Sequence, residues 1–320
     1  MQAWLEKFPD DRVEAIVRTR DRDEVAREWR ADRWLSNARI HVTRAPVHAL
    51  AAMSANSDAD VVLTQNFSSI VPGRAKRVTF LHDLIFLEHP EWFTWAERRY
   101  LAAVRPSLAR ADLILTTSES EAARIRRHVR GRAVTAVGLG MRVDLEVADA
   151  HRPATAPSSD FLLAVGRINR RKNLGSLIRA LADGQILGDN LSLVVVGSPD
   201  GARDELDPEL RAHVHFMGDL SDSGLRWLYE NTRLFVFPSL DEGFGMPIIE
   251  AARFGSQMAV SDIPPFRELN ATSFVFDPLN RESMVRAVRA ALDAPKPQRR
   301  VPQGWGEVVS NMRESILEHS

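Results

Sequence analysis

A cluster of four cations is the most informative feature of the sequence. Residues 166–173 read GRINRRKN and directly follow a short apolar run, so the cations lie where a strand would end and a helix would begin. Fixed positive charges together with the free N–H groups of a helix start form a site for phosphate. Arg167 and Lys172 are the predicted ligands, whereas Arg170 and Arg171 are expected to face water. The alternative is a solvated basic turn.

A second motif places two carboxylates around a glycine-rich turn. Residues 238–250 read PSLDEGFGMPIIE, with Glu242 in the turn and Glu250 about one turn inside the following helix. Gly243 and Gly245 allow a close backbone approach by a ligand. Each carboxylate oxygen accepts a hydrogen bond, which suits sugar hydroxyls. The alternatives are a helix-dipole partner for Glu250 and a surface position for Glu242.

A third candidate is the pair His82 and Asp83, at the end of an expected strand over 77–81. A histidine there can exchange a proton near neutral pH, although a structural histidine is about equally compatible with the residue type.

A basic stretch over 124–132 could contact anionic lipid or a phosphorylated acceptor, and a solvated helix face is the alternative we favour.

These motifs need a parallel sheet to bring them together. In the second half, apolar runs alternate with helix-patterned stretches, which predicts βαβ units. The expected strands are 161–165, 191–196, 214–217 and 234–237, and the expected helices lie near 173–183, 204–212, 221–231, 247–254 and 281–293.

The first half repeats this pattern more loosely. The expected strands are 13–17, 39–42, 61–65, 77–81, 113–116 and 134–137, and the expected helices are 21–35, 45–57, 92–109 and 119–130. A polar, proline-containing segment over 148–159 separates the halves. The sequence therefore predicts an α/β protein with two doubly wound, Rossmann-like domains, over 1–150 and 160–294, with ligands in the cleft between them.

Composition agrees with a soluble, intracellular protein of two domains. The chain has 320 residues, 44% of them hydrophobic, no cysteine and a formal net charge of −1. This charge balance argues against a nucleic-acid partner. We expect no signal peptide and no membrane span.

Several signatures of other chemistries are absent from the sequence. It contains no Walker loop, and the nearest approach to a dinucleotide fingerprint, over 138–143, fails at its last position. The two Asp-x-Asp pairs, 21–23 and 58–60, precede expected strands rather than follow them. We therefore predict no metal site and no cofactor.

Together, the motifs at 166–173 and 242–250 resemble the donor-binding half of retaining glycosyltransferases of family four, which have the GT-B fold. Segments 216–218, 261–264 and 276–278 add to the resemblance, as do FLHDL at 80–84, HPEWF at 89–93 and TSES at 117–120 on the acceptor side. The similarity covers about residues 60–293.

The resemblance implies a role for each matching residue. Arg167 and Lys172, after Gly166, would hold the diphosphate of a nucleotide sugar, and Glu250 would bind the ribose. Glu242 would contact the donor sugar, together with Gly243, Phe244 and Gly245. His82 and Asp83 would lie near the transferred sugar and the acceptor. The anomeric configuration would be retained, with the leaving phosphate taking the acceptor proton.

The family normally begins with a strand and a glycine-rich loop that the sequence does not show before the expected strand at 13–17. We therefore expect an incomplete N-terminal domain, with the helix over 305–320 packing back onto it.

The resulting hypothesis is a metal-independent transferase, best matched to mannosyltransferases of polysaccharide assembly. It would use GDP-mannose or another nucleoside-diphosphate sugar and a glycan or polyprenyl-linked acceptor. Its expected location is cytoplasmic, with peripheral contact at the inner face of the membrane. The alternatives are a non-catalytic nucleotide-sugar-binding protein and another GT-B enzyme such as an epimerase.

Overall fold

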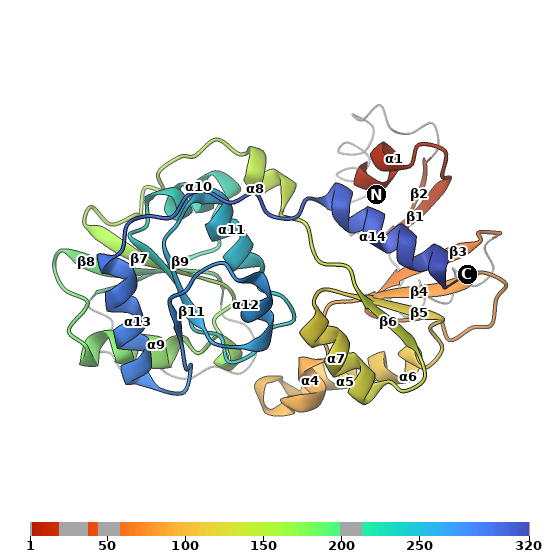
Figure 1. The fold of residues 1–320 in the computed structure, drawn as a ribbon, viewed down its shortest axis with the longest axis horizontal. Helices are drawn as coiled ribbons and strands as arrows, with labels where there is room; N and C mark the ends of the chain where they lie inside the picture. The colour runs from red at the N-terminus through yellow and green to blue at the C-terminus, as the bar shows by residue number, and fades with distance from the viewer. Residues whose placement is uncertain (1, 19–37, 44–57, 199–212, 320) are drawn as a thin grey trace. The chain divides into compact units, whose positions relative to one another are not determined.

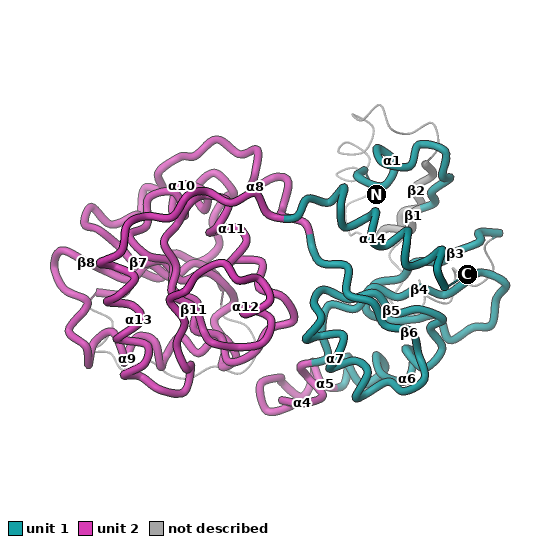
Figure 2. The backbone as a smooth tube through the Cα atoms, in the orientation of Figure 1, with its two compact units in different colours: residues 1–84, 99–139, 303–320 teal, residues 85–98, 140–302 magenta. Residues whose placement is uncertain are grey.

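The computed structural model describes residues 2–18, 38–43, 58–198 and 213–319 (Figure 1). The chain divides into two compact units (Figure 2). Unit 1 comprises residues 1–84, 99–139 and 303–320, and unit 2 comprises 85–98 and 140–302. The helices expected over 21–35, 45–57 and 204–212 lie outside the described residues.

Unit 2 is built on a six-stranded parallel sheet. Its order is β12-β11-β10-β7-β8-β9, with strands β7 (Asp160–Val165), β8 (Leu191–Val196), β9 (Val214–Gly218), β10 (Leu234–Phe237), β11 (Met258–Ser261) and β12 (Val275–Phe276). Most of the central residues are buried, as expected for a sheet covered on both faces. The strand pattern read from apolar runs is confirmed.

Helices cover both faces of this sheet (Figure 1). Helices α9 (Leu174–Asp183) and α13 (Arg281–Asp293) pack against one face, and α10 (Asp222–Asn231), α11 (Met246–Phe254) and α12 (Pro264–Leu269) against the other. The short helix α8 (Val143–Val147) packs against α10. Side-chain caps at Ser221 and Asn280 fix the starts of α10 and α13.

Unit 1 contains a four-stranded parallel sheet of order β3-β4-β5-β6. The strands are β3 (Val61–Gln65), β4 (Lys76–Leu81), β5 (Leu113–Thr116) and β6 (Ala133–Ala136). Strands β1 (Val13–Arg18) and β2 (Ala38–Thr43) pair with each other as a separate parallel sheet. The strands predicted for this half therefore fall into two sheets, because among the described residues no backbone ladder joins β1 to β3.

The helix predicted over 92–109 is wrong as a single element. The structure has α4 (Ile85–Glu88), a 3₁₀ turn η2 (Pro90–Trp92), α5 (Trp95–Leu101) and α6 (Val104–Leu108). Thr94 starts α5 by exchanging hydrogen bonds with Glu97, as in a capping box. Pro106 lies in the first turn of α6, where its missing N–H is tolerated, so a new helix begins there.

The first and last helices pack together within unit 1. Helix α14 (Trp305–Glu318) contacts α1 (Gln2–Lys7), and the guanidinium of Arg313 pairs with Asp11 at 3.0 Å. The ammonium of Lys76 in β4 donates to the backbone carbonyl of Ile316 at 2.8 Å. These contacts fasten α14 to β4 and to the segment that precedes β1.

Candidate functional site

The turn after β7 brings two backbone segments unusually close together. Gly166 has φ +138° and donates its N–H to the carbonyl of Val196. Gly197, at the end of β8, has φ +135°, and a Cβ there would lie 2.2 Å from the Gly166 carbonyl oxygen. Glycine is needed at both positions because it tolerates the positive φ, and at Gly197 also because it has no Cβ to collide with the Gly166 carbonyl. The carboxyl ends of β7 and β8 therefore form a tight backbone edge from which the basic segment starts.

The basic segment continues as a 3₁₀ turn, η3 (Arg170–Lys172), before α9 begins. Asn169 caps this turn by accepting the N–H of Lys172. Asn173 has φ +54° and donates its side-chain amide to the carbonyl of Pro278 at 2.8 Å. Asn173, in its left-handed conformation, separates η3 from α9 and holds the backbone next to Lys172 in place.

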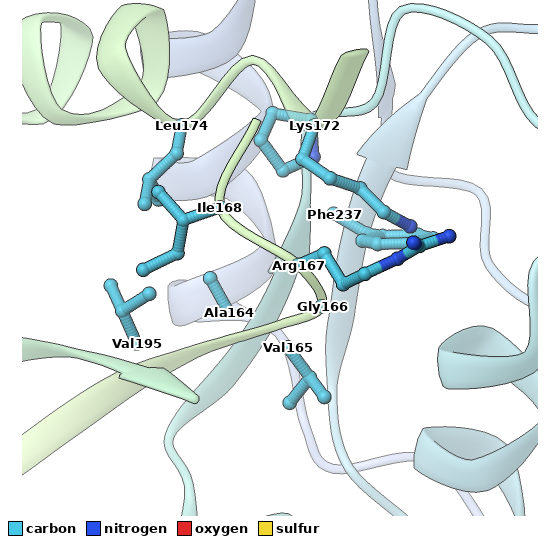
Figure 3. Close-up of a pocket in the computed structure, with 10 residues that line it drawn as sticks. Ala164, Val165, Gly166, Arg167, Ile168, Lys172, Leu174, Val195 and Phe237 are labelled. Atoms are coloured by element: carbon cyan, nitrogen blue, oxygen red, sulfur yellow. The ribbon is translucent and has the colours of Figure 1, made fainter. Parts of the chain in front are cut away.

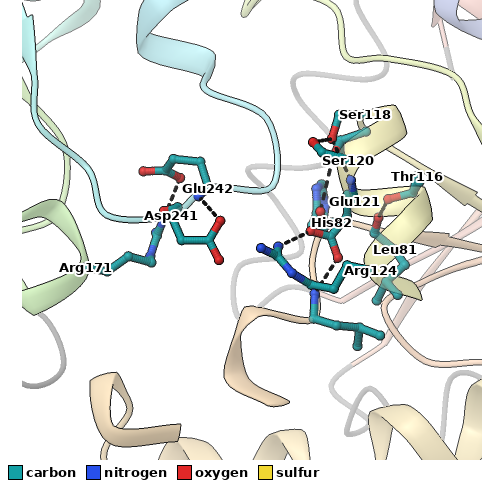
Figure 4. Close-up of polar contacts among 12 residues, drawn as sticks. Leu81, His82, Thr116, Ser118, Ser120, Glu121, Arg124, Arg171, Asp241 and Glu242 are labelled. Carbon is teal, nitrogen blue, oxygen red and sulfur yellow. Dashed lines mark hydrogen bonds and ion pairs between the residues drawn. The ribbon is translucent and has the colours of Figure 1, made fainter. Parts of the chain in front are cut away.

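Glu242 lies at the centre of an ion cluster (Figure 4). Its Oε1 accepts hydrogen bonds from the ammonium of Lys172 at 2.6 Å and from the hydroxyl of Ser239 at 2.8 Å. The guanidinium of Arg171 pairs with the other oxygen and also donates to the backbone carbonyl of Asp241. The carboxyl ends of β7 and β10 thus meet through their side chains.

The charges in this cluster depend on one another. Glu242 is 8% exposed, and burial alone would raise the pKa of its carboxyl. Arg171 and Lys172 outweigh that cost and lower its pKa to about 2, so the carboxylate stays ionised. Burial lowers the pKa of Lys172, and the carboxylate of Glu242 opposes that effect. Lys172 also lies 4.6 Å from the centroid of the Phe237 ring.

Arg171 is a residue that the sequence reasoning assigned wrongly. It was expected to face water, yet its side chain is 12% exposed and paired with Glu242. The tight η3 turn explains the difference, because it directs consecutive side chains to different sides, and Arg170 remains exposed. A one-turn 3₁₀ helix leaves no sequence period from which this direction could be read.

Arg167 lines a small cavity with Gly166, Lys172 and Phe237 (Figure 3). The cavity lies at the carboxyl end of β7, beside the glycine edge. Arg167 and Lys172, the two cations predicted as ligands, therefore line one cavity with the Phe237 ring beside Gly166. The other residues that line it are apolar.

The glycine-rich turn holds the start of α11. Gly245 has φ +115°, and a Cβ there would lie 2.9 Å from the ring of Phe266 in α12. Phe244 packs against the hydrophobic core of unit 2, and Gly243 precedes it. The turn after β10 is therefore packed against α12 and the core of unit 2.

Glu250 lies in a different environment from Glu242. It is 4% exposed, and its Oε2 accepts the hydroxyl of Tyr229 at 2.8 Å. Burial raises the pKa of Glu250, while the Tyr229 hydrogen bond and the charge of Arg142 act in the opposite direction. Among the described residues, no hydrogen bond or ion pair joins Glu250 to the Glu242 cluster.

In unit 1, His82 lies at the carboxyl end of β4. Its Nε2 is 2.5 Å from the side-chain Nε2 of Gln65, and its backbone N–H donates to the side chain of Asn66. The hydroxyl of Thr117 donates to its carbonyl. Burial lowers the pKa of His82, and the neighbouring charge of Asp83 partly opposes this. The imidazole is therefore neutral at pH 7.

The turn after His82 rests on a buried glutamate–arginine pair, Glu121 and Arg124, that the sequence reasoning missed. Glu121 is 1% exposed, and its Oε1 accepts the N–H of Leu84 at 2.8 Å (Figure 4). Its other oxygen pairs with Arg124. Burial raises the pKa of Glu121 to about 8, although Arg124 favours the charged form. The only sequence signal was the spacing Ser118-x-x-Glu121, typical of a capping box at the start of α7 (Glu119–His128).

Within the basic stretch over 124–132, Arg124 is buried and the other four arginines are exposed. Arg124 is 9% exposed and paired with Glu121. Arg126 and Arg132 donate to the backbone carbonyls of Val134 and Ala111. These three arginines thus have structural contacts within unit 1.

Among the described residues, no group of three or more histidine or acidic side chains could hold a metal ion. None of the helices that the structure describes is long and apolar enough to span a bilayer.

The fold and the strand-end site define a class of protein: an α/β protein of the GT-B type. The structure resembles that of WaaG, a glycosyltransferase involved in lipopolysaccharide biosynthesis, with a TM-score of 0.61, 18% identity and coverage of 94% of each chain. It also resembles sucrose-phosphate synthase from Thermosynechococcus elongatus, with a TM-score of 0.58, 21% identity and coverage of 85% of this chain and 72% of the other. The fold class expected from the sequence is confirmed.

Residues 149–304 match the family described as glycosyl transferases group 1. The serotype-specific mannosyltransferase WbdA of Escherichia coli is 28% identical over 213 residues, which cover 59% of this chain and 26% of WbdA. The O-antigen chain mannosyltransferase RfbU of Salmonella typhimurium is 33% identical over 136 residues, or 41% of this chain and 38% of RfbU. Residues 149–304 are therefore similar to group 1 glycosyltransferase domains, and the chain spans only part of the length of these curated relatives.

Proposed function

We propose that the protein is a retaining glycosyltransferase that moves a hexose, mannose as first choice, from a nucleoside-diphosphate sugar to a glycan or lipid-linked acceptor. The observation that carries the proposal is the cluster at the carboxyl ends of β7 and β10. Buried Lys172 and Glu242 lie there at 2.6 Å, and Lys172 lines a cavity together with Arg167. The similarity to mannosyltransferases supports the choice of sugar.

The cluster can perform the central task of this reaction. When the bond between the sugar and the diphosphate breaks, negative charge grows on the leaving phosphate oxygens. Arg167 and Lys172 would stabilise that charge, and fixed cations in a partly buried site do so at little reorganisation cost. Glu242 holds Lys172 and Arg171 in place before the donor arrives and would accept hydrogen bonds from the donor sugar.

The remaining site residues take narrower roles in the proposal. Glu250 would accept hydrogen bonds from the ribose, and the backbone at Gly243, Phe244 and Gly245 would contact the donor sugar. His82 and Asp83 would act near the acceptor, and the leaving phosphate would take the acceptor proton. A cytoplasmic location, with contact to anionic membrane lipid, belongs to the same proposal.

Two measurements test this function. The first is a thermal-shift panel of nucleotides and nucleotide sugars, because a ligand at 100 times its dissociation constant adds about 2.7 kcal/mol of stability. The second is sugar transfer by wild type and Arg167→Ala with the best donor of the panel. Wild-type transfer by Arg167→Ala would overturn the phosphate assignment. Tight binding without turnover by wild type would identify a non-catalytic binding protein. Acceptor-independent release of nucleotide together with a sugar inverted at one carbon would identify an epimerase.

A further inference from the structure

A buried tyrosine–glutamate pair connects two helices on one face of the unit 2 sheet. Tyr229 belongs to α10 and Glu250 to α11, and the two helices pack against each other. The hydroxyl of Tyr229 donates to Oε2 of Glu250 at 2.8 Å. Tyr229 is completely buried, and Glu250 is 4% exposed. This hydrogen bond therefore forms in a region from which water is largely excluded.

The tyrosine ring has little freedom to turn away. It lies 5.6 Å from the ring of Phe235 and stacks at 6.0 Å on Phe254, measured between centroids. The backbone carbonyl of Tyr229 also accepts the hydroxyl of Ser256 at 2.6 Å, which fixes this end of α10 to the loop after α11. The direction in which the Tyr229 hydroxyl points is set by the core.

The carboxylate of Glu250 is held by one oxygen only. Oε2 accepts the Tyr229 hydroxyl, while Oε1 accepts no hydrogen bond from the part of the chain that the structure describes. A buried carboxylate needs hydrogen-bond donors to remain ionised, and a ligand hydroxyl would provide them. The nearby charges of Arg142 and Asp222 act on it in opposite directions, and these two side chains pair with each other.

We propose that Tyr229 is a positioning residue for nucleotide-sugar binding: by holding Oε2 of Glu250, it leaves Oε1 aimed at the ribose hydroxyls of the donor. The inference rests on the proposed function, which assigns the ribose to Glu250. Tyr229 lies outside the motifs at 166–173 and 242–250. In this proposal it affects ribose recognition only through Glu250 and does not touch the ligand. Loss of its hydroxyl should therefore weaken recognition of the ribose hydroxyls while leaving the phosphate contacts intact.

The experiment measures dissociation constants by calorimetry for GDP and for 2′,3′-dideoxy-GDP, which lacks both ribose hydroxyls; UDP and its dideoxy form are run in parallel. The variants are Tyr229→Phe, Glu250→Ala and, as the matched control, Tyr100→Phe, which removes the other tyrosine hydroxyl of the chain from an exposed position in unit 1. The readout is the ratio of the dideoxy to the ribo dissociation constant, because general damage to the core changes both constants together.

We expect wild type and Tyr100→Phe to show the same large ratio and Glu250→Ala a ratio near one. Tyr229→Phe should lower the ratio by about tenfold, the size of one hydrogen bond to a charged group. An unchanged ratio in Tyr229→Phe, with Glu250→Ala near one, would overturn this inference and leave the proposed function standing. A wild-type ratio in Glu250→Ala, or no nucleotide binding by wild type, would refute the ribose assignment and the inference with it.

Discussion

The two units each bury a glutamate at the carboxyl end of a parallel sheet, and the two glutamates are held in opposite ways. Glu242 in unit 2 faces two cations, which lower its pKa to about 2. Glu121 in unit 1 has one cation, Arg124, and burial raises its pKa to about 8. Both carboxyls are buried: two cations outweigh the cost of burial at Glu242, whereas at Glu121 one cation does not, and the charge of Asp83 raises the pKa further.

This difference separates two kinds of site. A cluster whose carboxylate and cations stay ionised suits a charged ligand such as a diphosphate. The unit 1 cluster combines a neutral glutamate, a neutral His82 and the hydroxyls of Thr117 and Ser118, which suits an uncharged polar ligand such as a sugar. Substitutions of either glutamate test whether the two sites differ in this way.

The largest effect is expected for Glu242→Gln. The variant leaves Arg171 and Lys172 buried without their carboxylate, so the free energy of unfolding should fall by about 3–5 kcal/mol. Denaturant unfolding measures it. The control is Glu282→Gln, because the Glu282 side chain is 89% exposed and forms only a long contact, 3.9 Å, with Arg286. Equal stabilities of the two variants would show that the cluster is not a coupled unit.

The second largest effect is expected for Lys172→Met, and it concerns activity. Removing one donor to the leaving phosphate should lower kcat/KM for sugar transfer by a factor of about 10²–10³, or ~2.7–4 kcal/mol. Arg170→Met is the matched control, since Arg170 is exposed on the same turn and should retain wild-type transfer. Similar losses of kcat/KM in both variants would show that the turn acts through its total positive charge and not through a specific contact of Lys172.

Glu121→Leu should have a smaller effect on stability. It removes the acceptor of both the Leu84 N–H and the Arg124 guanidinium, and should cost about 1–3 kcal/mol. Glu121→Gln keeps an acceptor oxygen and removes a carboxyl that is already protonated at pH 7, so it should cost less than Glu121→Leu in the same unfolding assay. A Glu121→Gln variant as damaged as Glu242→Gln would show that both glutamates are ionised.

The smallest expected effect is a difference in pH dependence. The pKa of Glu121 is higher in the folded protein than in the unfolded chain, so its contribution to stability is complete below about pH 4.5 and is lost as the pH rises through about 8. Glu242 behaves oppositely: its contribution is complete above about pH 4.5 and is lost as the pH falls towards 2.

Unfolding curves from pH 5 to 8 should therefore show wild type losing stability relative to Glu121→Gln as the pH rises. The difference between wild type and Glu242→Gln should stay constant over the same range. Parallel pH profiles for wild type and Glu121→Gln would contradict the raised pKa of Glu121.

Much of the fold could be predicted because buried parallel strands leave an apolar run in the sequence. The runs at 161–165, 191–196 and 234–237 match β7, β8 and β10 to within one residue. The single helix over 92–109 could not be predicted correctly, because Pro106 is compatible with both a helix start and a helix end.

The sequence by itself showed which charged groups lie at the strand ends. The cations of 166–173 and the carboxylates at 242 and 250 follow apolar runs, and the chain must turn where each run ends. Only the tertiary structure showed which group each of these side chains contacts. Arg171 pairs with Glu242, Tyr229 with Glu250 and Glu121 with Leu84, across separations of 71, 21 and 37 residues. Such pairings depend on how the elements pack, and no local period encodes the direction of a side chain in a single turn.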